Sequence, residues 1–233
     1  MQPTFLPWPG YFRLMRQVAV FVFLDDVQLS RQSWQTRNRV LVGGRVHWIS
    51  APVKHAGLDQ TIADTELVET GSWRAKMARL LRQGYARHPF VADLQRLVDR
   101  IEGGGEQCLA DLNIALIVDC ASRLGITPIC HRSTAIGLTS THRTERLIEI
   151  CRTLRCDSYL AAAGSAGYLE ADGFRDQSDI ELAVACYEPP AYPQQGQRDF
   201  VSHLSIIDVV ANLGWQGAAQ YISGPWLEGG DTA

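Results

Sequence analysis

The 233-residue sequence lacks several patterns that mark large functional classes. No apolar run approaches the roughly 20 residues that a membrane-spanning helix needs, and no secretory signal is visible. The formal net charge is only -3, which speaks against nucleic-acid and anionic-membrane partners. We therefore expect a cytoplasmic protein with no nucleic-acid partner and no membrane insertion.

The six cysteines lack the spacing of a metal site or a redox motif. No two of them form a Cys-x-x-Cys pair, and no cysteine–histidine cluster has zinc spacing. We expect buried, reduced thiols that pack as small apolar side chains, and we assign no residue to a metal site. A catalytic cysteine stays open, although no neighbouring residue argues for one.

The common glycine-rich phosphate motifs are also missing. Gly164-Ser165-Ala166-Gly167 follows an apolar run and precedes a short helical stretch, so its backbone N–H groups are candidates for holding an anion. It is neither Gly-x-Gly-x-x-Gly nor a loop ending in Gly-Lys-Ser/Thr. A tight turn explains the segment at least as well, and Ser165 and Tyr168 are substrate-binding candidates only.

The most informative segment that is present lies in the first dozen residues, where three prolines and a glycine surround a tryptophan. Proline fixes its own φ and restricts the preceding residue, whereas glycine permits turns closed to other residues. We therefore expect a stiff, shaped loop, and Trp8, Gly10 and Tyr11 are candidate substrate-binding residues.

Strand and helix patterns alternate along the rest of the chain. Residues 18–24 are apolar on both faces, which indicates a buried strand of a parallel sheet. Two alternating runs joined by Gly43-Gly44 predict a β-hairpin near 35–52, with Arg39 opposite Trp48 and Arg37 opposite Ser50. Three helical stripes near 70–124 predict a helical insertion, or subdomain.

The last hundred residues alternate between short apolar runs and amphipathic stretches. The sequence therefore predicts an α/β fold with a mostly parallel sheet flanked by helices. We expect a single domain over residues 1–223, followed by a flexible tail over 224–233.

Asp25 and Asp26 directly follow the first apolar run. Ligands of open α/β sheets gather beyond the carboxyl ends of the strands, so these carboxylates are candidates for a general base or a Mg²⁺ ligand. Neighbours on a strand point to opposite faces, so we expect one of the two to face a site. A solvated turn, or pairing with nearby arginines, is the alternative.

Arg37-Asn38-Arg39 is the second candidate site. On a strand the two guanidinium groups project from one face about 7 Å apart, a geometry that can clamp a phosphate or carboxylate. Trp48 is then the neighbour across the hairpin, and we expect it to stack on Arg39. An exposed basic hairpin with ordinary cross-strand pairs is the alternative.

Two further patterns carry candidate acid–base groups. Ser205 and Asp208 have the spacing of serine–base chemistry, yet the same spacing is typical of a helix start close to a capping box. His47 beside Trp48 is a candidate acid–base residue because of its useful pKa, although a lone histidine is more often structural.

The sequence resembles the WbqC-like family in short segments that run in order along nearly the whole chain. These segments are Gln2-Pro3, Leu6-Pro7-Trp8, Gly10-Tyr11-Phe12, Phe23-Leu24-Asp25-Asp26-Val27-Gln28, Arg37-Asn38-Arg39, Trp48 with Pro52-Val53, Tyr85 with Pro89-Phe90, Leu112-Asn113, Tyr159-Leu160, Gly167-Tyr168-Leu169, Phe174, Tyr192 with Gln194, and Phe200 with Leu204-Ser205-Ile206-Ile207-Asp208 and Asn212-Leu213-Gly214. The opening loop and the Arg-Asn-Arg segment are the most specific.

The resemblance implies a cytosolic enzyme of bacterial O-antigen, other surface-glycan or specialised-metabolite biosynthesis. It implies transfer of an acyl or aminoacyl group to an amino group of a sugar or small-molecule precursor. A nucleotide-sugar is then a candidate substrate and an acyl carrier a candidate donor. In this interpretation Arg37, Asn38 and Arg39 hold the ligand and an aspartate orients or deprotonates the amine.

Two other functions stay open. One is ATP-dependent nucleotidyl transfer with a nucleotide and Mg²⁺ held by Asp25 or Asp26, because the loop, helix and strand at the start resemble nucleotidylyltransferases. Trp8-Pro9-Gly10-Tyr11 lacks both histidines of their His-x-Gly-His element. The other is a non-catalytic binding protein of a biosynthetic complex.

One departure from the family pattern concerns the beginning of the chain. Family members carry a short strand before the Gln-Pro pair, whereas Met1 directly precedes Gln2 here. We expect either a start codon further upstream or a sheet without that strand, and in the second case the proline-rich loop loses its anchor.

Overall fold

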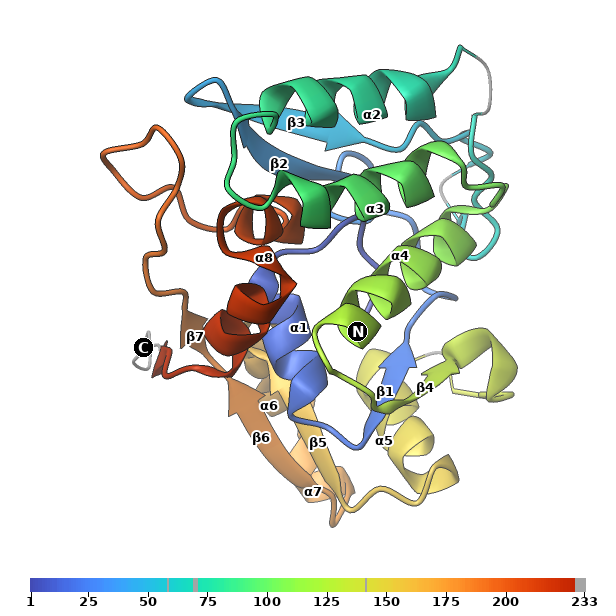
Figure 1. Ribbon diagram of the computed structural model, residues 1–233. Coiled ribbons are helices and arrows are strands. Elements are labelled where there is room, and N and C mark those ends of the chain that lie inside the picture. The colour runs from blue at the N-terminus through green and yellow to red at the C-terminus, as the bar shows by residue number, and fades with distance from the viewer. Residues whose placement is uncertain (58, 69–70, 141, 229–233) are drawn as a thin grey trace.

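Strands and helices alternate through the computed structural model, which describes residues 1–57, 59–68, 71–140 and 142–228 (Figure 1). The helices are α1 (Pro9–Arg16), α2 (Trp73–Gly84), α3 (Val91–Glu102), α4 (Leu109–Arg123), α5 (Arg143–Thr153), α6 (Ala166–Ala171), α7 (Phe174–Gln177) and α8 (Ile206–Ser223), with short 3₁₀ turns at Ser133–Ala135 and Ala163–Ser165. The strands are β1 (Val20–Phe23), β2 (Arg37–Val42), β3 (Arg45–Ser50), β4 (Ile129–Arg132), β5 (Ser158–Ala162), β6 (Glu181–Ala185), β7 (Tyr187–Glu188) and β8 (Leu227–Glu228). The predicted α/β class is confirmed.

Two parallel strand pairs form the centre of the fold. β1 pairs with β4, with Val20 opposite Ile129, and β5 pairs with β6, with Ser158 opposite Glu181. Among the described residues these pairs are separate two-stranded ladders, as are β2–β3 and β7–β8. The predicted parallel pairing is therefore present, but β1 and β5 are not joined to each other.

The hairpin has the predicted register. Arg39 lies opposite Trp48 and Arg37 opposite Ser50, and both residues of the Gly43-Gly44 turn have positive φ. A two-residue turn of this kind suits the right-handed twist of the strands, and glycine adopts positive φ without steric cost.

The three helices predicted near 70–124 are present as α2, α3 and α4. Their buried leucines, such as Leu81, Leu97 and Leu116, belong to one apolar cluster with Phe12 of α1 and Val209 of α8. Figure 1 shows α2 and α3 lying alongside the hairpin and α8. The helical region therefore shares the main core, whereas a smaller cluster fills the space between α5, α7 and β5–β6.

The end of the chain differs from the expected flexible tail in its described part. Trp226 is buried, Arg13 Nη1 donates a 2.7 Å hydrogen bond to the Gly224 carbonyl, and β8 pairs with β7. Packing of Trp226 against Tyr221 and Tyr187 holds this segment on the body of the protein. Residues 229–233 lie outside the described residues.

The cysteines only partly follow the expected burial. All six are free thiols, of which Cys120 and Cys151 are buried and Cys130 is exposed. Separately, within the described ranges, no helix has both the length and the apolar character that crossing a bilayer requires.

Candidate functional site

The proline-rich opening segment forms a loop that side-chain amides and hydroxyls hold in place. Leu6 has a φ of +45°, a left-handed conformation that non-glycine residues adopt at an energetic cost. Asn38 Nδ2 donates to the carbonyl oxygens of Phe5 (3.1 Å) and Leu6 (2.9 Å), and Ser205 Oγ donates to Leu6 at 2.8 Å. These buried bonds satisfy the loop carbonyls and fix its shape.

Backbone and amide contacts from three other elements complete this attachment. The Phe5 N–H donates to the Trp34 carbonyl, and the Ile206 N–H at the start of α8 donates to the Pro7 carbonyl. Asn113 of α4 donates from Nδ2 to the Pro3 carbonyl at 3.0 Å. The loop is thus bound to the hairpin, α4 and α8, which makes it a rigid wall for a site.

Gly10 has a steric role that the sequence did not reveal. A Cβ at this position would lie only 2.1 Å from the Trp8 indole, so the ring can lie over the start of α1 because residue 10 is glycine. Trp8 also stacks against His203, with ring centroids 4.7 Å apart. Gly10 therefore positions the tryptophan and does not line the cavity itself.

A cavity of about 260 Å³ lies between this loop and the hairpin. Its lining combines aromatic, amide and imidazole groups, from Met1, Thr4, Pro7, Trp8, Tyr11, Trp34, Asn38 and His203. Aromatic walls with a few convergent polar groups are typical of small-molecule sites. Of the predicted residues, Trp8, Tyr11 and Asn38 meet here, and we call this cavity the loop pocket.

Arg37 and Arg39 flank the loop pocket on the hairpin. The Arg39 guanidinium lies 5.7 Å from the Trp34 ring and donates to the His203 carbonyl at 3.3 Å, so it neighbours two lining residues. Arg37 lies 4.2 Å over Trp48, and Trp48 in turn stacks on Trp34. The predicted stacking of Trp48 on Arg39 is wrong, because the guanidinium over the Trp48 ring is that of Arg37 and Arg39 lies over Trp34.

No carboxylate in the described part of the chain neutralises the charges of the two arginines. Neither side chain forms an ion pair with a carboxylate in the described part of the chain, and the buried Nε of each has no hydrogen-bond partner there. A buried guanidinium N–H without a partner is costly unless a ligand satisfies it. The pair therefore has capacity for a phosphate or carboxylate.

His203 is a lining residue that the sequence analysis missed. It has positive φ (+57°), which turns its ring toward Trp8, and its Nδ1 lies 2.9 Å from Ser202 Oγ. Partial burial lowers the pKa of His203 below its ordinary value, the charge of Glu188 opposes this shift, and the charge of Arg39 adds to it. The lowered pKa favours the neutral imidazole, which can accept a proton.

Asp25 and Asp26 are not part of this pocket, contrary to the interpretation that places them in a shared site. Arg132 Nε donates to Asp25 at 2.6 Å, Thr134 N–H donates to it at 3.1 Å, and Arg146 is ion-paired with Asp26. Burial alone raises the pKa of Asp25, but the bonds from Thr134 and Arg132 outweigh it and lower the pKa. These carboxylates join β1 to β4 and α5. The alternative of pairing with Arg37 or Arg39 is also wrong.

Asp208 lies in the core and not in the pocket. It is fully buried and accepts hydrogen bonds from Tyr85 Oη (3.0 Å) and Tyr192 Oη (2.7 Å). Burial raises its pKa, and the tyrosine bonds oppose that shift. Its neighbour Ser205 caps α8 by accepting from the Ile207 N–H, as the helix-start interpretation predicted. Neither side chain reaches the cavity.

The remaining candidates lie elsewhere. His47 is exposed on β3 opposite Val40, and Ser165 and Tyr168 lie at the start of α6, where Arg143 covers the tyrosine ring at 4.4 Å. None of the three lines the loop pocket. Among the described residues no group of three or more His, Cys, Asp or Glu side chains is arranged to hold a metal ion.

Trp34 and His203 were not found from the sequence. Trp34 precedes the hairpin in a loop without a recognisable motif, and it is 47% exposed. An exposed tryptophan within a few residues of two arginines is the signal that could have identified it. His203 offers no comparable local signal because its role depends on the fold of the opening loop.

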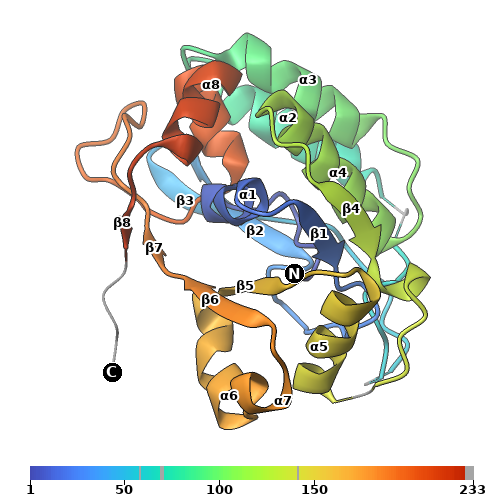
Figure 2. The same ribbon diagram turned by 90° about the horizontal axis from the view of Figure 1, so that it is seen from below.

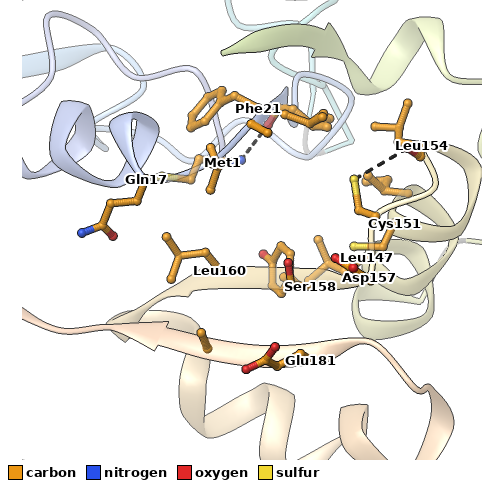
Figure 3. Close-up of a pocket in the computed structure, with 18 of the residues that line it drawn as sticks. Met1, Gln17, Phe21, Leu147, Cys151, Leu154, Asp157, Ser158, Leu160 and Glu181 are labelled. Carbon is orange, nitrogen blue, oxygen red and sulfur yellow. Dashed lines mark hydrogen bonds between the residues drawn. The ribbon is translucent and has the colours of Figure 1, made fainter. Parts of the chain in front are cut away.

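A second, larger cavity lies between β1 and β5 (Figure 3). This groove has a volume of about 590 Å³ and is lined by Leu14, by β1, by Leu147 of α5 and by β5. Met1 lines both this groove and the loop pocket.

One protein-family model matches the chain over nearly its whole length, including the site. The model of the WbqC-like protein family matches residues 2–220, a range that includes every residue of the loop pocket except Met1. "Uncharacterized protein Rv1507c" of Mycobacterium tuberculosis (strain ATCC 25618 / H37Rv) is 27% identical over 218 residues, which cover 92% of each chain. No solved structure matches the chain.

Proposed function

Because the chain belongs to the WbqC-like protein family, we propose that it is a transferase that acts on a small anionic precursor of surface-glycan or specialised-metabolite biosynthesis. The observation that carries this proposal is the loop pocket with its aromatic walls, next to two arginines that no described carboxylate neutralises. These groups suit a ligand with a flat or sugar ring and a phosphate, such as a nucleotide-sugar.

The binding mode follows from the positions of the side chains. Trp8 and Trp34 contact the ring of the ligand, and Asn38 is oriented by its own bonds to the loop. Arg39, next to Trp34 and His203, receives the phosphate with Arg37 on its outer side. Two guanidinium groups already packed on indole rings lose little side-chain freedom when they bind an anion.

The proposed reaction is acyl or aminoacyl transfer to an amino group of this ligand. The amine nitrogen attacks the carbonyl carbon of a thioester donor, so a C–N bond forms and the C–S bond breaks. His203 takes the proton that the amine loses and passes it to the departing thiolate. A neutral imidazole at the wall of the pocket is suited to this general-base role.

Ligand binding by matched arginine variants is the direct test of this proposal. Thermal shift and isothermal titration with a panel of nucleotide-sugars should give an affinity at least tenfold weaker for Arg37→Ala and for Arg39→Ala. Arg45→Ala is the control, because Arg45 is exposed on the same hairpin but lies next to its Gly43-Gly44 turn, opposite Val42. Full binding by both pocket variants would overturn the proposal.

Turnover distinguishes the transferase from the other two functions. With acyl-thioester donors, His203→Gln should retain binding and lose about 100-fold or more of the transfer rate. Release of pyrophosphate or AMP with a cognate acid would instead indicate nucleotidyl transfer, which needs Asp25 or Asp26 to exchange an arginine for a metal. Binding without turnover of any donor would indicate a non-catalytic binding protein.

A further inference from the structure

The turn at the end of α5 brings two cysteines next to each other. The Cys156 N–H donates to the Cys151 carbonyl at 2.8 Å, and the Arg155 N–H donates to the Arg152 carbonyl at 3.1 Å. Arg155 between them has a φ of +55°. These two bonds and the left-handed residue define a Schellman motif, which commonly brings the side chains at the positions of Cys151 and Cys156 into contact.

The end of α4 has the same motif with ordinary apolar side chains. The Ile126 N–H donates to the Ala121 carbonyl at 2.8 Å. The Gly125 N–H donates to the Ser122 carbonyl at 3.1 Å, and Gly125 has a φ of +69°. Ala121 and Ile126 are both buried in the main core. At the end of α5, two thiols take the positions that an alanine and an isoleucine fill at the end of α4.

The backbone of this turn holds the two cysteines within the range of a disulfide. Covalent geometry on either side of the 2.8 Å hydrogen bond keeps the Cα atoms of Cys151 and Cys156 within about 6.7 Å of each other. Disulfides join residues whose Cα atoms lie about 4.4–6.8 Å apart. The Cys156 thiol donates only a weak hydrogen bond, to the Leu154 carbonyl at 3.7 Å. The backbone separation therefore allows a bond between the two sulfur atoms.

Both thiols line the groove between β1 and β5, which gives small reagents access to them. Cys156 is partly exposed, whereas Cys151 is only 4% exposed. Figure 3 shows Cys151 on the side of α5 that faces the groove, and Figure 2 shows α5 next to β5. Burial raises the pKa of Cys151 to about 11, and the charge of the Cys156 thiolate adds to this shift. Cys156 is therefore the thiol that reacts first with an oxidant, and Cys151 reacts second.

We propose that Cys151 and Cys156 are a redox-active pair that a low-molecular-weight disulfide, such as oxidised glutathione, converts to a reversible intramolecular disulfide. The Cys156 thiolate attacks one sulfur of the oxidant, so that a mixed disulfide forms, the S–S bond of the oxidant breaks and one thiolate leaves. Cys151 then loses its proton and attacks the Cys156 sulfur, and the second thiolate leaves. The protein gives up two electrons and two protons, and the oxidant becomes two thiols.

The disulfide joins the last turn of α5 to the residues that lead into β5. Ile150 of α5 and Ser158 of β5 line the same groove as the two cysteines. In the thiol form the turn between them depends on Arg155, which holds a left-handed conformation that glycine usually adopts at this position. The disulfide therefore fixes one wall of the groove where the backbone is strained. Neither cysteine lines the loop pocket, so the redox pair does not depend on the proposed function.

Tryptic peptide mapping of the full chain tests the proposal directly, because Arg152 and Arg155 are cleavage sites between the two cysteines. The protein is equilibrated with oxidised glutathione, alkylated and digested without reduction. Residues 147–152 and 156–175 should then appear as one disulfide-linked species, which dithiothreitol separates. Oxidation should also raise Tm by roughly 4 °C, because the disulfide closes a short loop in the unfolded chain.

Single alanine variants separate this pair from the other thiols. In Cys151→Ala the reaction should stop at the mixed disulfide, so Cys156 keeps a glutathione adduct and oxidation no longer raises Tm. Cys130→Ala is the matched control, because Cys130 is exposed on β4, and it should leave the linked peptides and the rise in Tm unchanged. Each variant is compared with its own reduced form, so a general loss of stability cancels.

Two results would overturn the proposal. One is a pair of unlinked peptides with free thiols at Cys151 and Cys156 in protein whose exposed Cys130 carries glutathione, because the oxidant then reached the protein without closing the pair. The other is a disulfide from Cys156 to any cysteine except Cys151, because the turn at the end of α5 would then not hold the two thiols together.

Discussion

Asn38 donates a 2.9 Å hydrogen bond from its side-chain amide to the carbonyl of Leu6, a residue held at a φ of +45°. The contact connects the middle of the Arg37-Asn38-Arg39 segment to the middle of the proline-rich loop. The two most specific sequence segments are therefore one structural unit, in which the asparagine supports the loop and the arginines remain available on the same strand.

The Asn38 contact predicts a coupled loss of stability and binding. Asn38→Ala leaves two buried carbonyl oxygens without this donor, and we expect the free energy of unfolding to fall by about 2–3 kcal/mol. Relaxation of Leu6 should also weaken ligand binding in the loop pocket. Urea unfolding and titration of the same ligand panel measure both effects. Val46→Ala, at an exposed position of the hairpin, is the control and should change neither.

The buried carboxylate of Asp208 predicts a structural defect. Asp208→Ala leaves the hydroxyls of Tyr85 and Tyr192 without their acceptor, at a cost of about 3 kcal/mol, whereas Tyr192→Phe removes one bond and costs about 1 kcal/mol. Urea denaturation at pH 7 gives both values. A stable Asp208→Ala protein that has lost only turnover would contradict this structural role and restore the catalytic interpretation.

Because the pKa of Asp208 is raised, its contribution to the free energy of unfolding depends on pH. Its contribution to stability is complete below the ordinary aspartate pKa and declines as pH rises through the higher folded value. The penalty of Asp208→Asn should therefore be largest near pH 4 and smaller at pH 7. Paired denaturation curves of parent and variant at the two pH values measure this difference, and a penalty that grows with pH would refute the stated direction.

The contribution of Asp25 to stability should change with pH in the direction opposite to that of Asp208. Its pKa is lowered, so its contribution is present above the ordinary aspartate pKa of 3.8 and is lost as pH falls through the folded value. We expect Asp25→Asn to cost about 2 kcal/mol at pH 7 and much less near pH 2, with ligand binding unchanged. Asp59→Asn, on the surface, is the control and should be neutral at both pH values.

The buried amino group of Met1 predicts a dependence of stability on pH in the neutral range. With a folded pKa of about 5 against 8.0, the unfolded chain binds more protons between these values, so stability rises with pH by up to about 1.4 kcal/mol per unit. Acetylation of the amino group should remove this slope. His88 and His203, whose pKa values are also lowered, contribute equally to both forms and cancel in the comparison. Identical slopes for the two forms would show that the amine is solvated.

Local patterns in the sequence predicted most of the secondary structure. The apolar run at residues 18–24 contains β1, and the alternating runs around Gly43-Gly44 fixed the hairpin with its register. The helix start predicted from Ser205 and Asp208 is present as the beginning of α8, and Gly214, with a φ of +68°, interrupts the helical conformation further along α8. The spacing of apolar residues and the geometry of a tight turn depend on residues within a few positions of each other. Local periodicity was therefore sufficient to predict these strands and helices.

Only some of the residues at the candidate site could be predicted from the sequence. Trp8, Tyr11, Asn38, Arg37 and Arg39 were recognised by type and spacing, and they do surround or flank one cavity. Asp25 and Asp26 were placed at the site by the sequence because their partners, Arg132 and Arg146, lie more than 100 residues away in the chain. A carboxylate next to a distant arginine cannot be told from a catalytic one by its local sequence.

By itself the sequence determined the strands and helices, the stiff loop and the guanidinium pair, because each depends on φ restrictions and on side-chain periodicity within a short segment. Tertiary structure alone decided which charges are neutralised, that Asn38 and Ser205 support the loop, and that His203 faces Trp8. Those properties depend on which distant groups the folded chain brings within hydrogen-bonding distance, and no local pattern encodes that.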